Sequence, residues 1–141
     1  MTDKTIAFII DLINKGEAHE LVFLRPLSTT VLISKTWISS ENVAVCKNDA
    51  YDMFFVKNEK NLVVAAVLDM GRQDHHVYVK PEYRRNGFLV NALKEVILPY
   101  LFSTGRQEQH ITFENPQAKH HAELVGFHFL SDRKLCSDLS G

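Results

Sequence analysis

The stretch that decides the fold is "VYVKPEYRRNGFLVNAL", residues 77–93. A run of β-forming residues ends at Pro81, and a long segment with apolar residues at helical spacing follows the junction Arg-Arg-Asn-Gly, residues 84–87. The first backbone amides of a helix have no intrahelical acceptor, and the helix dipole adds about half a positive charge there. The junction therefore predicts an anion site suited to phosphate or pyrophosphate, with a solvated polar turn as the alternative.

The residues before this stretch predict strands. Two apolar segments, 53–57 and 62–70, flank the polar tetrad 58–61, which indicates a β-hairpin. The second segment is apolar on both faces, so we expect a central strand covered on both sides. Residues 75–80 then read as a third strand that leads into the junction.

The N-terminal segment predicts a helix, because isoleucines recur at helical spacing from Ile6 to Ile13. Thr2 or Asp3 can cap this helix and Gly16 can end it. The region 17–51 is harder to interpret. Residues 20–24 and 29–34 resemble short extended pieces separated by a proline, and residues 37–50 fit a helix, a strand or a loop.

The C-terminal half continues with alternating helices and strands. A buried helix is expected over 88–105, and Pro99 should kink or end it. A strand over 110–115, a helix with Pro116 at its first position and a last strand over 127–131 follow. The order indicates an α+β fold in a single domain, residues 1–141, with a mixed, mostly antiparallel sheet flanked by helices.

Composition limits the classes of function. The 141 residues carry a formal net charge of -1, which gives no global basic field for nucleic acid or an anionic membrane. Cys46 and Cys136 lie far apart, and neither they nor the histidines show a metal-binding spacing, so we expect reduced thiols and no metal. With no apolar run near the ~20 residues of a membrane span and no signal-peptide cleavage site, a cytoplasmic protein is expected.

Two segments together resemble the GNAT superfamily of N-acetyltransferases. "VYVKPEYRRNGF", residues 77–88, is similar to the acyl-CoA-binding segment of that family, in which a strand leads into R/Q-x-x-G-x-G/A and a helix. "ENPQAKHHAELVGFHFL", residues 114–130, is similar to the second family segment, and its matching positions are Asn115, Ala118, Gly126 and Phe127. The resemblance covers residues 52–130 well, and it implies the GNAT fold.

The resemblance implies a binding mode for acetyl-CoA or another acyl-CoA. The pyrophosphate would be held by the backbone amides of five consecutive residues, which are Arg85, Asn86, Gly87, Phe88 and Leu89, with Arg84 at the start of the motif. Backbone groups of Val77 and Val79 would pair with the pantetheine arm as if it were an added strand. Asn115 would reach the pantetheine from the neighbouring strand, where the two strands splay apart.

Two positions depart from the family pattern. Leu89 stands where the family has Gly or Ala, and its amide can still donate provided its side chain turns into the core. Ala122 stands where many members have a tyrosine that protonates the leaving thiolate. The first departure weakens or adjusts cofactor binding, and the second removes the usual acid.

Transfer of an acyl group to an ammonium nucleophile needs a base. The candidates are Glu114, either His75 or His76 at the start of a strand, and His121 beside the missing tyrosine, with His120 next to it. Alternate strand residues face opposite sides, so only one of His75 and His76 can point into a site. We take Glu114, His76 and His121 as the catalytic candidates, against the alternative that each is a solvated surface residue.

The expected function is acetyl-CoA-dependent N-acyl transfer by direct attack of an amine on the thioester. The acceptor would be an amine-bearing small molecule or a protein, shaped by residues 17–51, and a second copy of the chain is a further expected partner. The alternative is a GNAT-fold module that has lost efficient transfer, as Leu89 and Ala122 would allow, and acts through CoA binding or protein contact.

Overall fold

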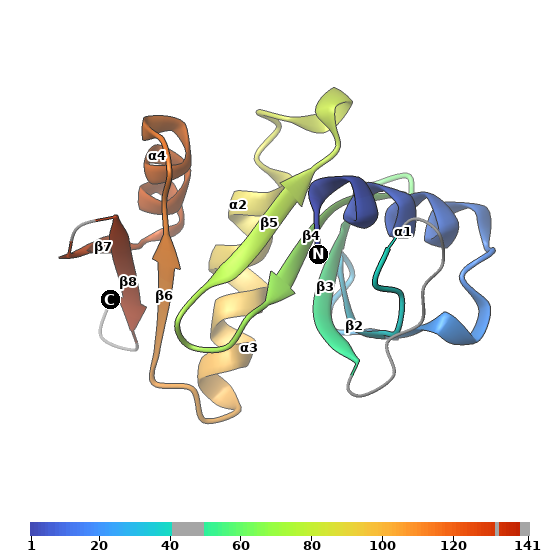
Figure 1. Cartoon of the computed structure of the whole chain (residues 1–141), viewed down its shortest axis with the longest axis horizontal. Coiled ribbons are helices and arrows are strands. Elements are labelled where there is room, and N and C mark those ends of the chain that lie inside the picture. The colour runs from blue at the N-terminus through green and yellow to red at the C-terminus, as the bar shows by residue number, and fades with distance from the viewer. Residues whose placement is uncertain (41–49, 132, 139–141) are drawn as a thin grey trace. The chain divides into compact units, whose positions relative to one another are not determined.

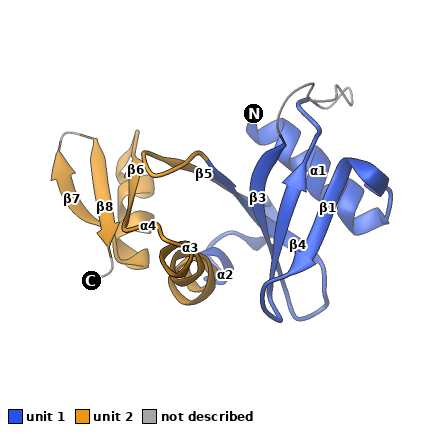
Figure 2. Ribbon diagram, turned by 90° about the horizontal axis from the view of Figure 1, so that it is seen from below, with its two compact units in different colours: residues 1–69, 76–89 blue, residues 70–75, 90–141 orange. Residues whose placement is uncertain are grey.

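The computed structural model describes residues 1–40, 50–131 and 133–138. The chain divides into two compact units, which Figure 2 colours separately. Unit 1 consists of residues 1–69 and 76–89, and unit 2 consists of residues 70–75 and 90–141. Figure 1 shows a helix-and-sheet arrangement in each.

Unit 1 begins with helix α1, Asp3–Lys15, and the sequence predicted both of its ends. The Thr2 side chain caps the helix by accepting a hydrogen bond from the Thr5 amide, and Gly16 closes it in the left-handed conformation at φ 71°. Its isoleucines at positions 6, 9 and 10 are fully buried in the core of this unit.

The sheet of unit 1 has five strands in the order β1-β2-β3-β4-β5. The strands are β1 Val22–Pro26, β2 Val31–Thr36, β3 Tyr51–Lys57, β4 Val63–Asp69 and β5 His75–Val79. The β1–β2, β2–β3 and β3–β4 pairs are antiparallel. Residues 63–68 of β4 are all buried, which confirms the predicted central strand, and Asn14 of α1 bonds both backbone groups of Val63.

The structure describes residues 17–40 and 50–51 of the region 17–51. The extended pieces expected at 20–24 and 29–34 correspond to β1 and β2. Within the segment 37–50, residues 41–49 lie outside the described residues, and Cys46 lies among them.

A continuous helical segment follows the junction and crosses from unit 1 into unit 2. It consists of α2 Phe88–Ala92, a π-helical turn over Leu93–Ile97 and α3 Leu98–Ser103. Pro99 was expected to kink or end the helix: the segment runs on to Ser103, and its regular α-helical pattern is interrupted by the π turn directly before Pro99. In a regular helix the proline ring would clash with the carbonyl of Glu95. The wide turn directly before Pro99, closed by the Leu98 amide on the Leu93 carbonyl, accommodates the ring.

Unit 2 contains a second sheet of three strands in the order β6-β8-β7. The strands are β6 Glu108–Thr112, β7 His128–Ser131 and β8 Lys134–Asp138, and both pairs are antiparallel. Helix α4, Pro116–Val125, connects β6 to β7 and has the predicted proline at its first position. The expected strand at 110–115 lies earlier, at 108–112, and the sequence interpretation missed β8, whose short polar run carries no clear β pattern.

No helix in the described part of the chain is long and apolar enough to cross a membrane. The fold class is as expected from the sequence: α+β, with antiparallel strand pairs and flanking helices.

Candidate functional site

Strand β5 carries Val77 and Val79 at the outer edge of the first sheet. Within the described residues it has one neighbouring strand, β4. One row of its backbone N–H and C=O groups therefore faces away from the sheet, in the geometry that lets an extended ligand add as a further strand.

The turn after β5 is anchored to the rest of unit 1 through Lys80. Its amide donates to the Val64 carbonyl at 2.9 Å, and its Nζ lies 3.2 Å from an Asp11 carboxylate oxygen and 3.6 Å from one of Glu82. Burial opposes the ammonium charge, but the two carboxylates outweigh that effect and raise the pKa of Lys80. The chain therefore enters the junction from a fixed point.

The junction itself, which we call the 84–89 loop, has an unusual backbone. A 3₁₀ turn over Pro81–Tyr83 precedes it, and the Arg84 Nε donates to the Val79 carbonyl at 3.0 Å. Arg85 has φ 69° and Gly87 has φ 77°, so two residues in the left-handed region alternate with their neighbours just before the helix begins at Phe88. The amides of this loop directly precede the free amides of the helix N-terminus, which is a position at which anions bind.

The left-handed backbone of Arg85 is strained. A left-handed conformation costs a non-glycine residue on the order of 1–2 kcal/mol, so it persists only where the surroundings impose it. Residues 84–87 are all exposed. The amides of Phe88 and Leu89 have no intrahelical acceptor, because they belong to the first turn of the helix.

The Leu89 side chain turns into the core, as it must if the Leu89 amide is to remain free to donate. Its side chain is turned inward and the residue is 4% exposed. The bulky side chain therefore does not cover the loop, and the Leu89 amide stays compatible with a ligand. Phe88 packs edge-on against Tyr83, with ring centroids 6.5 Å apart, which steadies the loop from both ends.

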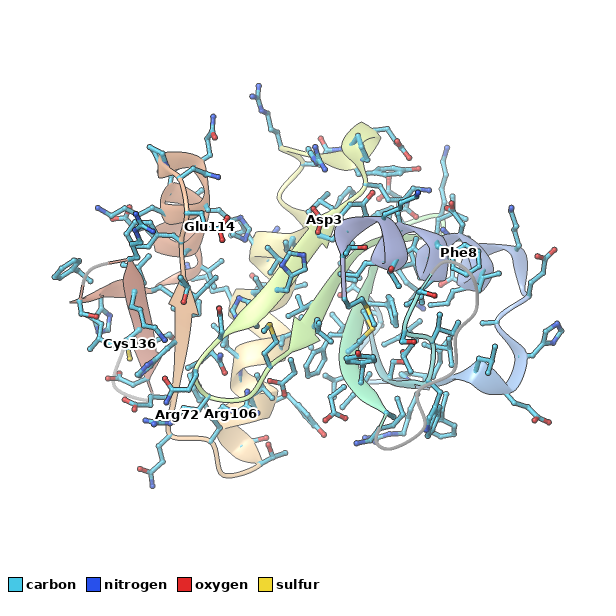
Figure 3. The ribbon with its side chains drawn as sticks, viewed as in Figure 1. Asp3, Phe8, Arg72, Arg106, Glu114 and Cys136 are labelled. Atoms are coloured by element: carbon cyan, nitrogen blue, oxygen red, sulfur yellow. The ribbon has the colours of Figure 1, made fainter. Side chains whose placement is uncertain are left out.

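Asn115 and Glu114 lie at the start of α4 in unit 2. The Asn115 side chain caps the helix, since its Oδ1 accepts a hydrogen bond from the Ala118 amide at 2.8 Å. That capping bond leaves the Asn115 amide NH₂ available for a ligand. Glu114 is exposed, and Figure 3 shows it beside α4.

The two histidines that open β5 have opposite environments. His75 is 7% exposed and packs edge-on against Phe127, with ring centroids 5.7 Å apart. His76 has an exposed side chain whose Nε2 lies 2.5 Å from an Asp3 carboxylate oxygen in the first turn of α1. The alternation expected for a strand is confirmed, and His76 is the solvent-facing member of the pair.

His121 lies in α4 next to the buried Ala122. Burial, followed by the charge of His120, lowers the pKa of His121, so its imidazole is held neutral near pH 7. Among the residues that the structure describes, its Nε2 atom has no hydrogen-bond partner. Ala122 is 1% exposed and offers no proton to a leaving group.

The predicted residues fall into two groups. Val77, Val79 and the 84–89 loop lie together in unit 1, and Glu114, Asn115 and His121 lie together along α4 and its N-terminus in unit 2. His76 belongs to unit 1. Sequence interpretation missed a third group in unit 2, Glu108, His110 and Cys136, because strand pairing and not sequence spacing brings it together.

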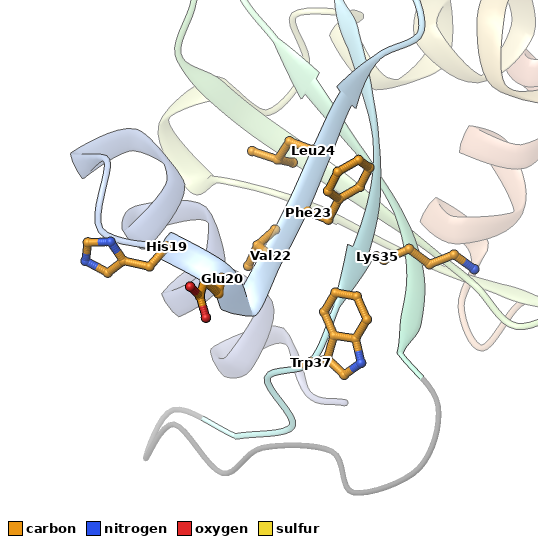
Figure 4. Close-up of a pocket in the computed structure, with 7 residues that line it drawn as sticks. All are labelled: His19, Glu20, Val22, Phe23, Leu24, Lys35 and Trp37. Atoms are coloured by element: carbon orange, nitrogen blue, oxygen red, sulfur yellow. The ribbon is translucent and has the colours of Figure 1, made fainter.

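A separate hollow of about 520 Å³ lies on strands β1 and β2 (Figure 4). It is lined by His19, Glu20, Val22, Phe23, Leu24, Lys35 and Trp37, which fall in the region expected to shape an acceptor site. However, β1 is at the opposite edge of the sheet from β5. Four strand spacings of about 4.8 Å each put it roughly 19 Å away, too far for direct attack on a thioester held at β5.

Comparison with known proteins supports the fold through structure and not through sequence. No protein-family model matches the sequence, and no curated protein does. A mutant of the spermidine N-acetyltransferase SpeG from Vibrio cholerae aligns over 99% of this chain and 93% of that chain, with 17% identity and a TM-score of 0.53. Mutant forms of the spermidine/spermine N-acetyltransferase SpeG from Vibrio cholerae align over 67% of this chain and 70% of that chain, with 20% identity and a TM-score of 0.50.

The SpeG alignment over nearly the whole chain includes both units, and identities of 17% and 20% establish the fold alone. Together with the edge strand β5, the 84–89 loop and the helix that follows it, the comparison identifies the architecture: the chain has the fold of the GNAT-superfamily N-acetyltransferases.

Proposed function

We propose that the protein is an acetyl-CoA-dependent N-acyltransferase that moves an acyl group from the CoA thioester to an amine. The observation that carries the proposal is the backbone of the 84–89 loop, in which Arg85 and Gly87 are both left-handed at the start of a helix. An exposed loop with this backbone presents amides at a helix N-terminus, and a pyrophosphate can accept hydrogen bonds from them.

Different residues would bind different parts of the cofactor. The amides of residues 85–89 bind the pyrophosphate, and Arg84 and Arg85 add positive charge. The Nε bond from Arg84 to the Val79 carbonyl ties the loop to the strand that receives the pantetheine arm. Val77 and Val79 pair with that arm through their outward backbone groups, and the Asn115 amide NH₂ donates to it.

The reaction is attack of a neutral amine on the thioester carbonyl, which forms a C–N bond and breaks the C–S bond. The proton of the incoming ammonium goes to a base, and the electron pair of the broken bond leaves on sulfur. The nitrogen loses a second proton as the C–S bond breaks, and that proton goes to the departing thiolate or to water. Glu114, His76 and His121 are the candidates for the base. His121 is favoured by its neutral, partly buried imidazole and unpartnered Nε2, whereas His76 is already engaged by Asp3.

The proposed reaction has no tyrosine to protonate the departing CoA sulfur. Ala122 occupies that position, so CoA leaves as a thiolate or takes its proton from water. The acceptor is an amine-bearing small molecule or a protein amine, in the same chemical class as the amines named for the SpeG structures.

Ligand-dependent stability tests the cofactor proposal. Thermal unfolding is followed while acetyl-CoA and CoA are added, with free adenosine as a control that lacks the pyrophosphate. At about 100 times its Kd the cofactor should add about 2.7 kcal/mol to the free energy of unfolding. A protein whose unfolding temperature does not respond to either CoA compound would contradict the proposal.

A second candidate is a CoA-binding module with little or no transfer activity. The observation that favours it is Ala122, which removes the usual acid. Release of free thiol from acetyl-CoA, measured against a panel of amines, separates the two functions. Binding together with amine-dependent thiol release supports the enzyme, and binding without it supports the module.

A further inference from the structure

A cluster of three metal-ligand side chains lies on the second sheet, remote in sequence from every residue assigned to the cofactor's pyrophosphate. We call it the β6–β8 cluster: Glu108 and His110 on β6 and Cys136 on β8. One ligand atom from each residue lies within 4.8 Å of the other two. Figure 3 places Cys136 on β8 and Arg72 near the foot of β6.

Strand register explains why the three side chains meet. His110 is directly opposite Cys136 in the antiparallel β6–β8 pair, and Glu108 is two residues before His110 on the same strand. Opposed residues of an antiparallel pair share a face, as do residues two apart on one strand. His128 is opposite Cys136 on the other side, in β7, so one more ligand-type residue lies on this face.

The two separations from the Glu108 carboxylate are close to those between ligand atoms around a bound zinc ion. His110 Nε2 lies 3.3 Å from Glu108 Oε1, and Cys136 Sγ lies 3.9 Å from Glu108 Oε2. In a tetrahedral site with bonds of about 2.0–2.3 Å, ligand atoms are roughly 3.3–3.8 Å apart. His110 Nε2 is buried and makes no hydrogen bond among the described residues, although it points toward the carboxylate.

The backbone that carries the cluster is held in place by a buried amide. Gln109 is 0% exposed, and its Nε2 donates to the carbonyls of Gly71 and His110 at 2.9 Å each. The His110 amide donates to the Arg72 carbonyl at 2.8 Å. Such fixed supports reduce the conformational cost of closing a ligand set around an ion.

The electrostatics also favour a cation. Arg72 forms an ion pair with Glu108 and is the positive charge that now balances the cluster. A divalent ion would supply more charge at shorter range and would hold the thiol as a thiolate.

We propose that Glu108, His110 and Cys136 form a zinc-binding site, with water in the fourth position. Sulfur and imidazole ligands together select zinc over the oxygen-preferring Mg²⁺ and Ca²⁺. Binding releases the Cys136 thiol proton to solvent, while His110 binds as the neutral imidazole and Glu108 as the carboxylate. The Arg72 guanidinium must give up part of its contact with Glu108 when the ion enters.

Cobalt spectroscopy on the full-length, metal-free protein tests the proposal. Co²⁺ bound by a thiolate in tetrahedral geometry gives near-ultraviolet charge-transfer absorption and strong visible bands. We expect one such Co²⁺ per chain, displaced by one Zn²⁺. The Cys136→Ser variant should lose the charge-transfer band, and the matched Cys46→Ser variant should keep it. No band in the wild-type protein, or a band lost only with Cys46→Ser, would overturn the proposal.

Two further variants guard against a result caused by misfolding. His110→Gln should weaken Zn²⁺ binding at least about tenfold in competition with a chromophoric chelator. Arg72→Met should act in the opposite direction and tighten binding by up to about fivefold, the equivalent of one exposed ion pair. A general loss of structure cannot strengthen binding, so weaker binding in Arg72→Met would count against the site.

Discussion

The 84–89 loop and the β6–β8 cluster are built in opposite ways. The loop offers backbone amides from one short run of sequence, and its binding property follows from the φ angles of Arg85 and Gly87. The cluster offers side chains from two strands that meet through the pairing of His110 with Cys136. A backbone site can therefore tolerate changes of neighbouring side chains, whereas a side-chain site fails with the loss of any one member.

Leu89→Ala gives the largest expected effect and tests the tolerance of the loop. Leu89 is 4% exposed, so truncation should lower the free energy of unfolding by about 2–5 kcal/mol. Affinity for acetyl-CoA should stay within about threefold or improve, because the amide is retained and a small residue restores the family pattern. Urea denaturation without ligand and calorimetric titration with it measure the two quantities.

Leu93→Ala is the matched control, since Leu93 is 1% exposed on the same helical segment. It should cost similar stability. A tenfold loss of affinity confined to Leu89→Ala would show that the Leu89 side chain, and not only its amide, shapes the site.

Asn115 has both a helix-capping role and a proposed cofactor role, and two substitutions separate them. Asn115→Ala removes the cap on α4 and should cost about 1 kcal/mol of stability. Asn115→Ser keeps a capping oxygen and should preserve stability. If the amide NH₂ reaches the pantetheine, both variants lose acetyl-CoA affinity; equal affinity in the serine variant and the wild type would limit Asn115 to its structural role.

Arg85→Gly tests whether acetyl-CoA binding depends on the backbone of the loop or on the Arg85 side chain. Glycine adopts φ 69° freely, so relief of strain should raise the free energy of unfolding by about 1 kcal/mol. Acetyl-CoA affinity should fall only a few-fold, because the amide stays and one charge is lost. Arg133→Gly, at φ 59°, controls for the strain alone, because it relieves the same conformation in another arginine. Complete loss of binding in Arg85→Gly would contradict a backbone-built site.

The smallest expected effect is the pH dependence due to His121. Its pKa is lowered in the folded state, first by burial and then by His120, so the unfolded chain binds more protons between the two pKa values. The stability that this residue contributes is present above its unfolded pKa of about 6.5 and is lost as the pH falls below it. His121→Gln should flatten the decline of the unfolding free energy between pH 7 and 5, and an unchanged slope would argue against the buried imidazole.

The same contrast explains what the sequence could predict. Features encoded locally were correct: the Thr2 and Gly16 ends of α1, the β3–β4 hairpin, the loop before Phe88 and Pro116 at the start of α4. Features that depend on pairing were missed, namely β8 and the β6–β8 cluster. Pro99 was expected to kink or end the helix; the helix continues past it through a π turn that no propensity rule anticipates.

His75 and His76 also show how far a prediction from sequence can go. Alternation along a strand predicted that His75 and His76 face opposite ways, but it could not say which one is buried. The contacts with Phe127 and Asp3 decide it, and both partners are remote in the sequence. Pairings of this kind depend on the packed core, so they become visible only in three dimensions.

The most direct test of the central claim is acetyl-CoA binding to the wild-type protein, Gly87→Glu and Gly16→Glu, measured side by side by calorimetry. Gly16 has φ 71°, close to the 77° of Gly87, so the two variants place the same charge on similar backbone at two different sites. We expect Gly16→Glu to bind like the wild type and Gly87→Glu to bind at least about a hundredfold more weakly. Equal affinities for Gly87→Glu and the wild type would show that the pyrophosphate does not bind at the 84–89 loop.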